Sequence, residues 1–442
     1  MANFRVWNFA YFLYMPMPHL NNRSIQLEWT QLLVLSGTHF LVDMFANMLP
    51  SILPVVREQF TLSLSMGAFI LVLLTLTSNF VQILTGHTRA NKAVPMFLHL
   101  GLVLSAGICL LSALPRSGGG IPLIVLLGII SGAGIAIAHP EGLRAVDSLR
   151  QIPPAISTAV FMTGGFLGFA AGGVISTHLV SGFGLAGLYP LTVCPLAGVL
   201  MVILSKVRLS TGHTENSRQA DCANAPGTKL PFWQLMVMAV PAAVSTTVVL
   251  SLLPTNLNEL GFKLTFGGFS ATMFGLGATV GPFAWAAIAQ KKGELPCSIL
   301  AFLLCVPLLA VYLLMTSSTA AVWMLFGLGF CSMSAYILII TIARHTSLPR
   351  AQFPAFAGTG LPLRKQGGGL SLGRRMAFIV GGTWGLANLI FLALIPVAQH
   401  YGTDLVLKFM PLGYLFSGAF GLYIMSRPER GRRTTNRQQP QT

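Results

Sequence analysis

Charged residues are scarce in this chain of 442 residues. Only 9% of the residues are Asp, Glu, Lys or Arg, and the acidic ones number just 11. A soluble domain carries about 25% charged residues on average, so this composition excludes a soluble protein. Mean hydropathy is +0.72. The solvent of this chain is therefore a lipid bilayer, where the backbone must satisfy its own hydrogen bonds as helices.

Motifs for metal, nucleotide and covalent chemistry are also missing. The six cysteines include no C-x-x-C pair, and five of them fall within apolar runs, where they act as small hydrophobic residues. The sequence contains no P-loop, no metal-ligand cluster and no nucleophile–base spacing. We therefore expect no enzyme, no metal and no cofactor, and we exclude an ATP-driven pump.

Long apolar runs fill most of the chain instead. A helix needs about 20 apolar residues to cross the hydrocarbon core, and the sequence predicts an all-α membrane protein with twelve such helices. The expected spans are 30–56, 64–86, 93–114, 121–140, 155–181, 185–205, 232–255, 265–289, 295–316, 320–343, 376–399 and 405–425.

Positive charge is distributed unevenly between the two sides of these helices. If the N-terminus is cytoplasmic, 23 of the 27 Lys and Arg residues fall on the cytoplasmic side. The exceptions are Arg57, Arg116, Lys263 and Lys408. This bias follows the positive-inside rule, and it predicts that both termini are cytoplasmic. We interpret the basic end of the chain as an orientation signal near anionic lipid, and expect no nucleic-acid partner.

A glycine-rich segment occurs once in each half of the chain. The pattern F-x-x-G-G-x-x-G-x-A begins at Phe161 and again at Phe378, in the fifth apolar run of each set of six. The repeated glycines are Gly164, Gly165 and Gly168, and Gly381, Gly382 and Gly385. Small residues let membrane helices approach closely, so we expect all six to pack against another helix.

The repeat predicts two six-helix bundles in tandem. The expected units are an N-terminal cytoplasmic or interfacial segment (1–29), a first bundle (30–205), a cytoplasmic linker (206–231), a second bundle (232–426) and a basic cytoplasmic tail (427–442). Parallel repeats of this kind occur in secondary transporters.

The first helix contains two ionisable residues at membrane depth. His39 and Asp43 are four residues apart and share a helix face, which Asn47 extends by another turn. Intramembrane charge is costly and usually functional. Burial disfavours the charged form of a carboxylate, which suits a proton carrier. We therefore predict Asp43 and His39 as proton-coupling residues and Asn47 as a substrate contact. The alternative is a structural His–Asp pair.

The end of the fourth helix carries a second polar group. His139, Glu141 and Arg144 lie in the run A-H-P-E-G-L-R, and Glu141 and Arg144 are spaced to pair on one helix face. We expect these residues at the cytoplasmic edge, where they brace a gate or take part in coupling. The alternative is an ordinary interfacial helix end.

The second half has almost no ionisable residue at depth. We predict Trp384 and Asn388, one turn apart, as substrate contacts in a cavity. Other polar residues at depth are hydroxyls, which usually bond to the backbone. They are Ser245, Thr246, Thr247, Ser332, Ser334 and Tyr336.

Three runs together resemble a known transporter family. S-G-T-H-F-L-V-D-M-F, H-P-E-G-L-R and V-F-M-T-G-G-F-L-G are similar to the fosmidomycin resistance branch of the major facilitator superfamily. His39, Asp43, His139, Glu141 and Arg144 fall on that branch's H-x-x-x-D and H-P-E-x-x-R positions. The resemblance implies a proton-driven exporter in a bacterial inner membrane. One departure is Ala90, which stands where the superfamily has an Asp between helices two and three.

These observations favour a secondary transporter, a proton antiporter that exports a small organic molecule or drug. Two alternatives stay open: a facilitator that imports a metabolite, and a membrane scaffold or sensor that kept the fold without transport. The expected partners are the small-molecule substrate, protons and the bilayer, with the chain as a monomer.

Overall fold

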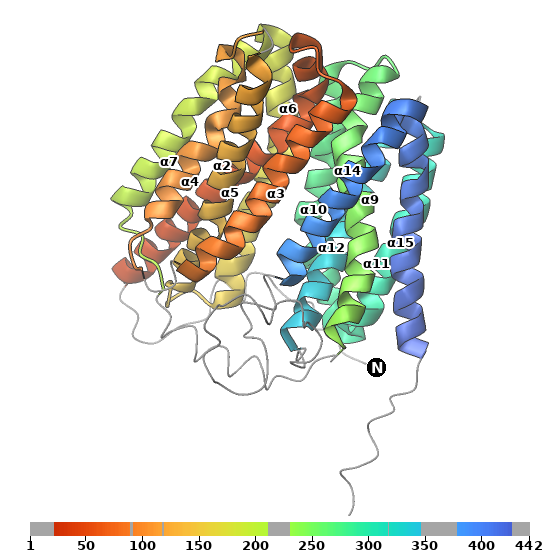
Figure 1. The fold of residues 1–442 in the computed structure, drawn as a ribbon. Helices are drawn as coiled ribbons and strands as arrows, with labels where there is room; N and C mark the ends of the chain where they lie inside the picture. Colours follow the sequence, from red (N-terminus) through yellow and green to blue (C-terminus); the bar gives the residue numbers. More distant parts are fainter. Residues whose placement is uncertain are drawn as a thin grey trace, which may run out of the picture.

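The computed structural model describes residues 22–88, 92–116, 119–210, 230–316, 318–345 and 378–426. Within these ranges the regular elements are all helical (Figure 1), which confirms the predicted all-α membrane fold. Several expectations concern residues outside the described ranges. They are the position of Ala90, most of the linker and the basic tail.

The first half begins with a helix that is longer than expected. Helix α2 starts at Asn22 rather than at residue 30, so it takes in the last part of the segment expected to precede the bundle. The elements of this half are α2 (Asn22–Gln59), α3 (Leu64–Thr88), α4 (Met96–Ser105), η1 (Ala106–Ala113), α5 (Gly120–Asp147), α6 (Pro154–Phe183), η2 (Gly184–Thr192) and α7 (Val193–Leu204).

The second half repeats this order of helices, with one irregular turn. Its elements are α9 (Phe232–Glu259), α10 (Leu264–Lys292), α11 (Glu294–Leu314), η3 (Thr319–Ala321), α12 (Val322–His345), η6 (Phe378–Gly382), α14 (Thr383–Tyr401) and α15 (Thr403–Ser426). The short element η6 is a π-helical turn directly before α14. Such turns are rare and often mark functional sites.

Eleven helical stretches of the described chain are long and apolar enough to cross a membrane, and one of them spans 49 residues, Ile156–Leu204. This stretch turns back at Gly184, whose φ is +63°. Both its ends lie beside the start of α2. Glu28 accepts the N–H groups of Arg150 and Gln151, before α6, and Gln31 donates to the Ser205 carbonyl, after α7. The stretch therefore supplies two crossings, which gives twelve.

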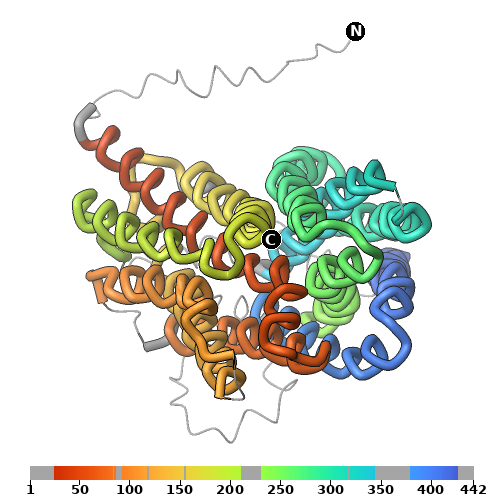
Figure 2. The backbone as a smooth tube through the Cα atoms, turned by 90° about the horizontal axis from the view of Figure 1, so that it is seen from above, coloured from red at the N-terminus to blue at the C-terminus, as the bar shows by residue number. Residues whose placement is uncertain are grey.

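The two halves form separate helical bundles (Figures 1 and 2), and each packs around its own apolar core. Phe45 and Met48 of α2 are fully buried in the first core, and Phe302 and Tyr414 are fully buried in the second. The larger core also takes in Leu64, Ala68 and Val72 of α3. The first turns of α3 therefore belong to the contact between the halves.

The two halves join on the side away from the linker. We call the end where α7 stops and α9 begins the linker end. Thr272 of α10 donates to the Ala170 carbonyl of α6 at 2.6 Å, and Thr75 of α3 donates to Asn388 of α14 at 2.8 Å. A Cβ built on Gly268 would lie 2.5 Å from the Gly173 carbonyl. These contacts lie near the middle of the helices or closer to the end opposite the linker end. The two halves therefore pack closely in that part of the molecule.

Candidate functional site

Two histidines and one aspartate meet between α2 and α5. His39 and Asp43 lie one turn apart on α2, with 3.3 Å between His39 Nε2 and Asp43 Oδ2. His139 of α5 places its Nε2 3.1 Å from Asp43 Oδ1. The two imidazole rings lie edge to face, with centroids 5.0 Å apart. The expected place of His139 at the membrane edge is therefore wrong, because the packing of α5 on α2 brings it to Asp43.

A backbone carbonyl fixes the orientation of each imidazole ring. His39 Nδ1 lies 2.9 Å from the Phe161 carbonyl oxygen, and His139 Nδ1 lies 2.7 Å from that of Ile135. A carbonyl oxygen only accepts hydrogen bonds, so each Nδ1 carries a hydrogen and donates it. In a neutral ring the Nε2 atom then presents a lone pair to the carboxylate. A hydrogen bond between Nε2 and Asp43 thus needs an additional proton, on the ring or on the carboxyl group.

The His39–Asp43–His139 cluster is partly accessible. Side-chain exposure is 20% for Asp43 and 21% for His139, but only 4% for His39. A small pocket borders both histidines; its open space amounts to about 190 Å³, and its enclosed part has room for about one water molecule. Its lining also includes Leu98 near the start of α4 and Gly142 on α5, which lie closer to the linker end. The cluster therefore faces a pocket on its linker side, while His39 forms the buried wall.

Glycines of α6 allow this cluster to form. A Cβ on Gly165 would lie 2.6 Å from Asp43 Oδ2 and would collide with the His39 ring. A Cβ on Gly164 or Gly168 would collide with the backbone carbonyl of Ser36 or Phe40. Helix α6 therefore lies directly against α2 only because these three positions lack a side chain. This contact explains the first copy of the glycine pattern.

The second copy of the pattern packs differently. A Cβ on Gly382 would make only an ordinary contact with Met236, at 3.6 Å. A Cβ on Gly385 would meet none of the described atoms within 4 Å, so the part of the chain that the structure describes gives Gly385 no close helix contact. Gly381 and Gly382 belong to the π-helical turn. A π-helical turn contains one residue more than an α-helical turn, so the glycine that follows it is rotated to another face.

Glu141 and Arg144 lie near the cluster, toward the linker end. Glu141 is fully buried and accepts the Leu98 N–H at 2.9 Å. Arg144 donates to the carbonyls of Ser210 and Lys92, at 3.1 Å and 2.8 Å. Their contacts join the end of α5 to the segment that begins α4 and to the chain after α7. Both side chains are therefore placed to hold several elements together at the linker end.

The two asparagines predicted to contact substrate form contacts between helices. Asn47 is 2% exposed and donates to the Phe169 carbonyl of α6 at 2.7 Å. Asn388 is 5% exposed, donates to the Trp384 carbonyl and accepts from Thr75 of the first half. Neither side chain lines the pocket beside the histidines. The structure thus assigns Asn47 to the α2–α6 contact and Asn388 to the contact between the halves.

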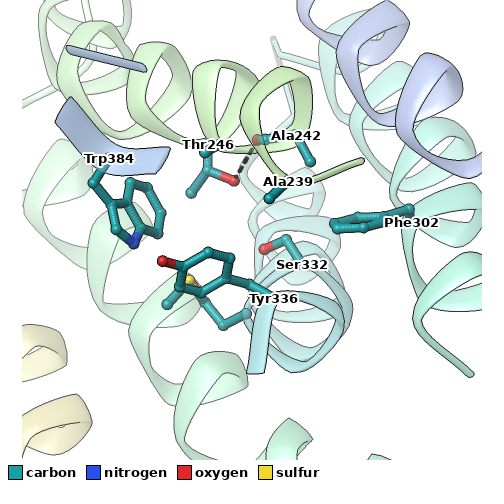
Figure 3. A pocket seen from close by; sticks show the side chains of 9 residues that line it. Ala239, Ala242, Thr246, Phe302, Ser332, Tyr336 and Trp384 are labelled. Carbon is teal, nitrogen blue, oxygen red and sulfur yellow. Dashed lines mark hydrogen bonds between the residues drawn. The ribbon is translucent and has the colours of Figure 1, made fainter. Parts of the chain in front are cut away.

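Trp384, by contrast, lines a cavity within the second half (Figure 3). The open space between these side chains amounts to about 210 Å³, and its enclosed part has room for only about one water molecule. Trp384 lies edge to face with Tyr336, at a centroid distance of 5.2 Å. We call it the second-half cavity, and its lining residues are Ala239, Ala242, Ala243, Thr246, Phe302, Ser332, Met333, Tyr336 and Trp384.

The hydroxyls of this cavity were expected to bond to the backbone, and they do so only in part. Thr246 donates to Ala242 O at 3.0 Å, and Tyr336 donates to Ile379 O at 3.3 Å. Ser332 is 3% exposed, and its hydroxyl is directed to the Tyr414 hydroxyl rather than to a backbone carbonyl of the described residues. Sequence alone could not separate Ser332 from the hydroxyls around it, because its helix position resembles theirs.

The His39–Asp43–His139 cluster is also compact enough for an ion. One nitrogen of each histidine and one Asp43 oxygen lie within 4.8 Å of one another, an arrangement that could hold a metal ion. Hydrogen bonds between Asp43 and the two histidines would explain the same short distances without a metal ion. A divalent cation is therefore a useful competitor in any assay of this cluster.

Comparison with known proteins gives one family and a fold. The model of the Major Facilitator Superfamily matches residues 35–361. A bacterial homolog of the human lysosomal transporter Spinster is similar in its inward-facing occupied and unoccupied structures, with TM-scores of 0.61 and 0.62. Sequence identity is 12% and 13%, over 89% and 90% of this chain and 96% of the other. At such identity the likeness concerns the fold alone. No curated protein matches the chain.

Proposed function

The chain belongs to the major facilitator superfamily, and we propose that it is a proton-coupled exporter of a small organic molecule. The family and the twelve crossings make it a multi-pass membrane transporter. The proton coupling, the direction and the substrate class are the content of the proposal. The resemblance to the fosmidomycin resistance branch supports export. The same resemblance supports a bacterial inner membrane, and the bias of Lys and Arg supports an orientation with both termini in the cytoplasm.

The arrangement of His39, Asp43 and His139 carries the proposal. Both Nδ1 atoms already donate to carbonyl oxygens, so each contact between an Nε2 atom and Asp43 holds together only when it contains a proton. One additional proton completes one contact, and two complete both. The number of bound protons therefore decides how firmly α2 and α5 are joined at this depth.

The free-energy cost of losing a proton from the cluster should be large enough to change the conformation. A buried hydrogen-bonding group left without a partner costs about 1–3 kcal/mol. Two conformations of a protein commonly differ by a few kcal/mol, so a cost of this size shifts their populations. Protonation of the cluster would then favour one arrangement of the first half, and release of the proton would favour the other. This is the differential binding that coupling requires.

The proposed route for the proton follows from which end is closed. The halves pack against each other on the side away from the linker, while the pocket beside the histidines lies toward the linker end. With the linker in the cytoplasm, the cluster exchanges protons with the cytoplasm in this conformation. Glu141 and Arg144, which hold the linker end together, are our candidates for the brace that replaces the missing loop Asp.

Two steps of experiment test the proposal. Growth of cells with and without the gene, across a panel of toxic compounds, identifies an exported compound. The purified full-length protein is then placed in liposomes containing a pH-sensitive dye, and proton movement is followed when that compound is added. We expect compound-dependent proton movement in the wild type and none in Asp43→Asn, which keeps shape but cannot ionise.

A matched control is available for this substitution. Asp404 is exposed and pairs with Lys408 on α15 at 2.6 Å, and Asp404→Asn should behave as the wild type. Addition of Zn²⁺ tests whether a cation competes for the cluster. Uptake of a metabolite without any proton movement in the wild type would support the importing facilitator, and no growth difference with any compound would support the scaffold.

A further inference from the structure

We propose that the His39–Asp43–His139 cluster binds a divalent transition-metal ion of the Zn²⁺ class, and that transport is blocked while this ion is bound. Binding of the ion follows from the geometry of the cluster alone, whereas its effect on transport rests on the proposed function. No local spacing motif marks the site, because His139 is 96 residues from Asp43. For that reason the sequence alone led us to expect no metal.

Lone pairs of three side chains converge inside the cluster. Backbone carbonyls hold the Nδ1–H group of each histidine, at 2.9 Å for His39 and 2.7 Å for His139. Each Nε2 atom of a neutral ring therefore turns its lone pair toward the Asp43 carboxylate, and such atoms repel one another unless a positive species lies between them. Metal-binding histidines show the same arrangement, since one ring nitrogen binds the ion while the other donates to a carbonyl or carboxylate.

The distances between these atoms suit zinc. Ligand atoms that lie roughly 2.0–2.2 Å from a tetrahedral Zn²⁺ are about 3.3–3.6 Å from one another. Nε2 of His39 lies 3.3 Å from Asp43 Oδ2, and Nε2 of His139 lies 3.1 Å from Asp43 Oδ1. One ligand atom from each side chain fits within 4.8 Å, so a modest rotation of the side chains closes the remaining distance. In the part of the chain that the structure describes, no other three His, Cys, Asp or Glu side chains come this close.

The small pocket beside the histidines supplies a fourth ligand position. Its enclosed part has room for about one water molecule, and both His39 and His139 line it. Zinc sites with three protein ligands hold a water molecule in the fourth position. The pocket lies toward the linker end, so an ion reaches the cluster from that side.

The types of ligand decide which ions bind. Imidazole nitrogens suit Zn²⁺ and related transition metals, whereas Mg²⁺ and Ca²⁺ prefer oxygen ligands. The cluster offers two nitrogens and one carboxylate. No lysine or arginine of the described chain pairs with Asp43, so this carboxylate is available to a cation. We therefore expect binding of Zn²⁺ and no binding of Mg²⁺ at the same concentration.

A bound ion would join α2 to α5 at membrane depth. His39 and Asp43 belong to α2 and His139 belongs to α5, so an ion bound to all three links the two helices. In the proposed cycle, release of a proton loosens this contact. A metal ion occupies the lone pairs that the proton needs and keeps the contact closed without one. Bound Zn²⁺ should therefore hold the first half in one arrangement and stop transport.

Calorimetry and thermal melting test the site, with full-length protein purified without a histidine tag and freed of metal. We expect one Zn²⁺ per chain, a rise in the melting temperature with Zn²⁺, and no effect of Mg²⁺. His139→Gln and Asp43→Asn, on different helices, should each weaken Zn²⁺ binding about tenfold or more, since even loss of an outer hydrogen-bond partner costs about 10- to 100-fold. His178→Gln, at an exposed histidine of α6, should bind as the wild type does.

Three results would overturn the site: no Zn²⁺ binding by the wild type, unchanged Zn²⁺ binding in both cluster variants, or equal binding of Mg²⁺. Melting without metal separates loss of the site from loss of the fold in each variant. In proteoliposomes, Zn²⁺ should stop compound-dependent proton movement and a chelator should restore it. Movement that continues at saturating Zn²⁺ would overturn the block. If the wild type without metal shows no compound-dependent proton movement, the coupling proposal fails, while the binding results still decide the metal site.

Discussion

The two halves of this molecule share a fold but differ in chemistry. The first half places His39, Asp43 and His139 within contact of one another at membrane depth. The second half has at the corresponding depth a cavity lined by aromatic rings and hydroxyls, without a formal charge. A duplicated bundle therefore repeats the helix arrangement, while each copy has acquired its own polar residues. The proposed proton site therefore belongs to the first half alone, since the lining of the second-half cavity offers no charged side chain.

The glycine repeat illustrates the same difference on a smaller scale. In α6 the glycines lie against the backbone of α2, and one of them leaves room for the histidine and the carboxylate. In the second half Gly382 belongs to the π-helical turn η6 and Gly385 follows it in α14, and neither makes a comparably close contact among the described residues. The same sequence pattern therefore allows close helix packing in one copy and forms an irregular backbone turn in the other.

The largest effect should come from enlarging Gly168. A Leu at this position would collide with the Phe40 backbone, which cannot move aside as a side chain can. Overpacking costs roughly 1–3 kcal/mol and occasionally more, so Gly168→Leu should lower the folded yield and the melting temperature in detergent. Gly385→Leu is the matched control and should change neither. Equal losses in both variants would show that the second copy packs as tightly as the first.

Removal of Arg144 should have the next largest effect. Its guanidinium donates to the carbonyls of Ser210 and Lys92, and hydrogen bonds from a charged group contribute about 1.5–3 kcal/mol each. Arg144→Ala should therefore weaken the linker end, and transport in proteoliposomes should stall or become leaky. Arg89→Ala, in the loop that lacks the superfamily's Asp, should transport as the wild type does. The reverse result would place the brace in the loop.

A change at His39 should alter the pH dependence without abolishing transport. Gln can donate an N–H to Asp43 without taking up a proton, so His39→Gln stabilises the ionised carboxylate. The cluster then binds its proton only at lower pH, and the pH optimum of transport should move down. His178→Gln, at an exposed histidine that bonds only to its own helix, is the control. An unchanged optimum in His39→Gln would remove His39 from the proton site.

The smallest effect is expected at the contact between the halves. Thr75→Val keeps the shape of the side chain but removes the hydrogen bond to Asn388, whose oxygen is then unpaired. The change should cost about 1 kcal/mol and should favour separated halves, which cysteine cross-linking between Ser65 and Gln399 would detect as a lower yield. An increased yield would contradict the assignment of this contact.

The sequence was informative wherever the evidence lay within one helix. Spacing by four residues places His39 and Asp43 on one face, and the structure shows them in contact. The meeting of Asp43 with His139 depends on how α5 packs on α2, and no local pattern in the sequence contains that information. The same periodicity places Asn47 on this face and predicts that it lines a cavity. In the structure α6 covers this position, and Asn47 donates to its backbone. Helix faces follow from periodicity, whereas the partner of each face follows from the packing.

The proposed proton site is tested most directly by one variant. Asp43→Asn in proteoliposomes should show no compound-dependent proton movement at any pH. Undiminished, pH-dependent proton movement in Asp43→Asn would show that the carboxylate is structural and that protons cross the membrane elsewhere.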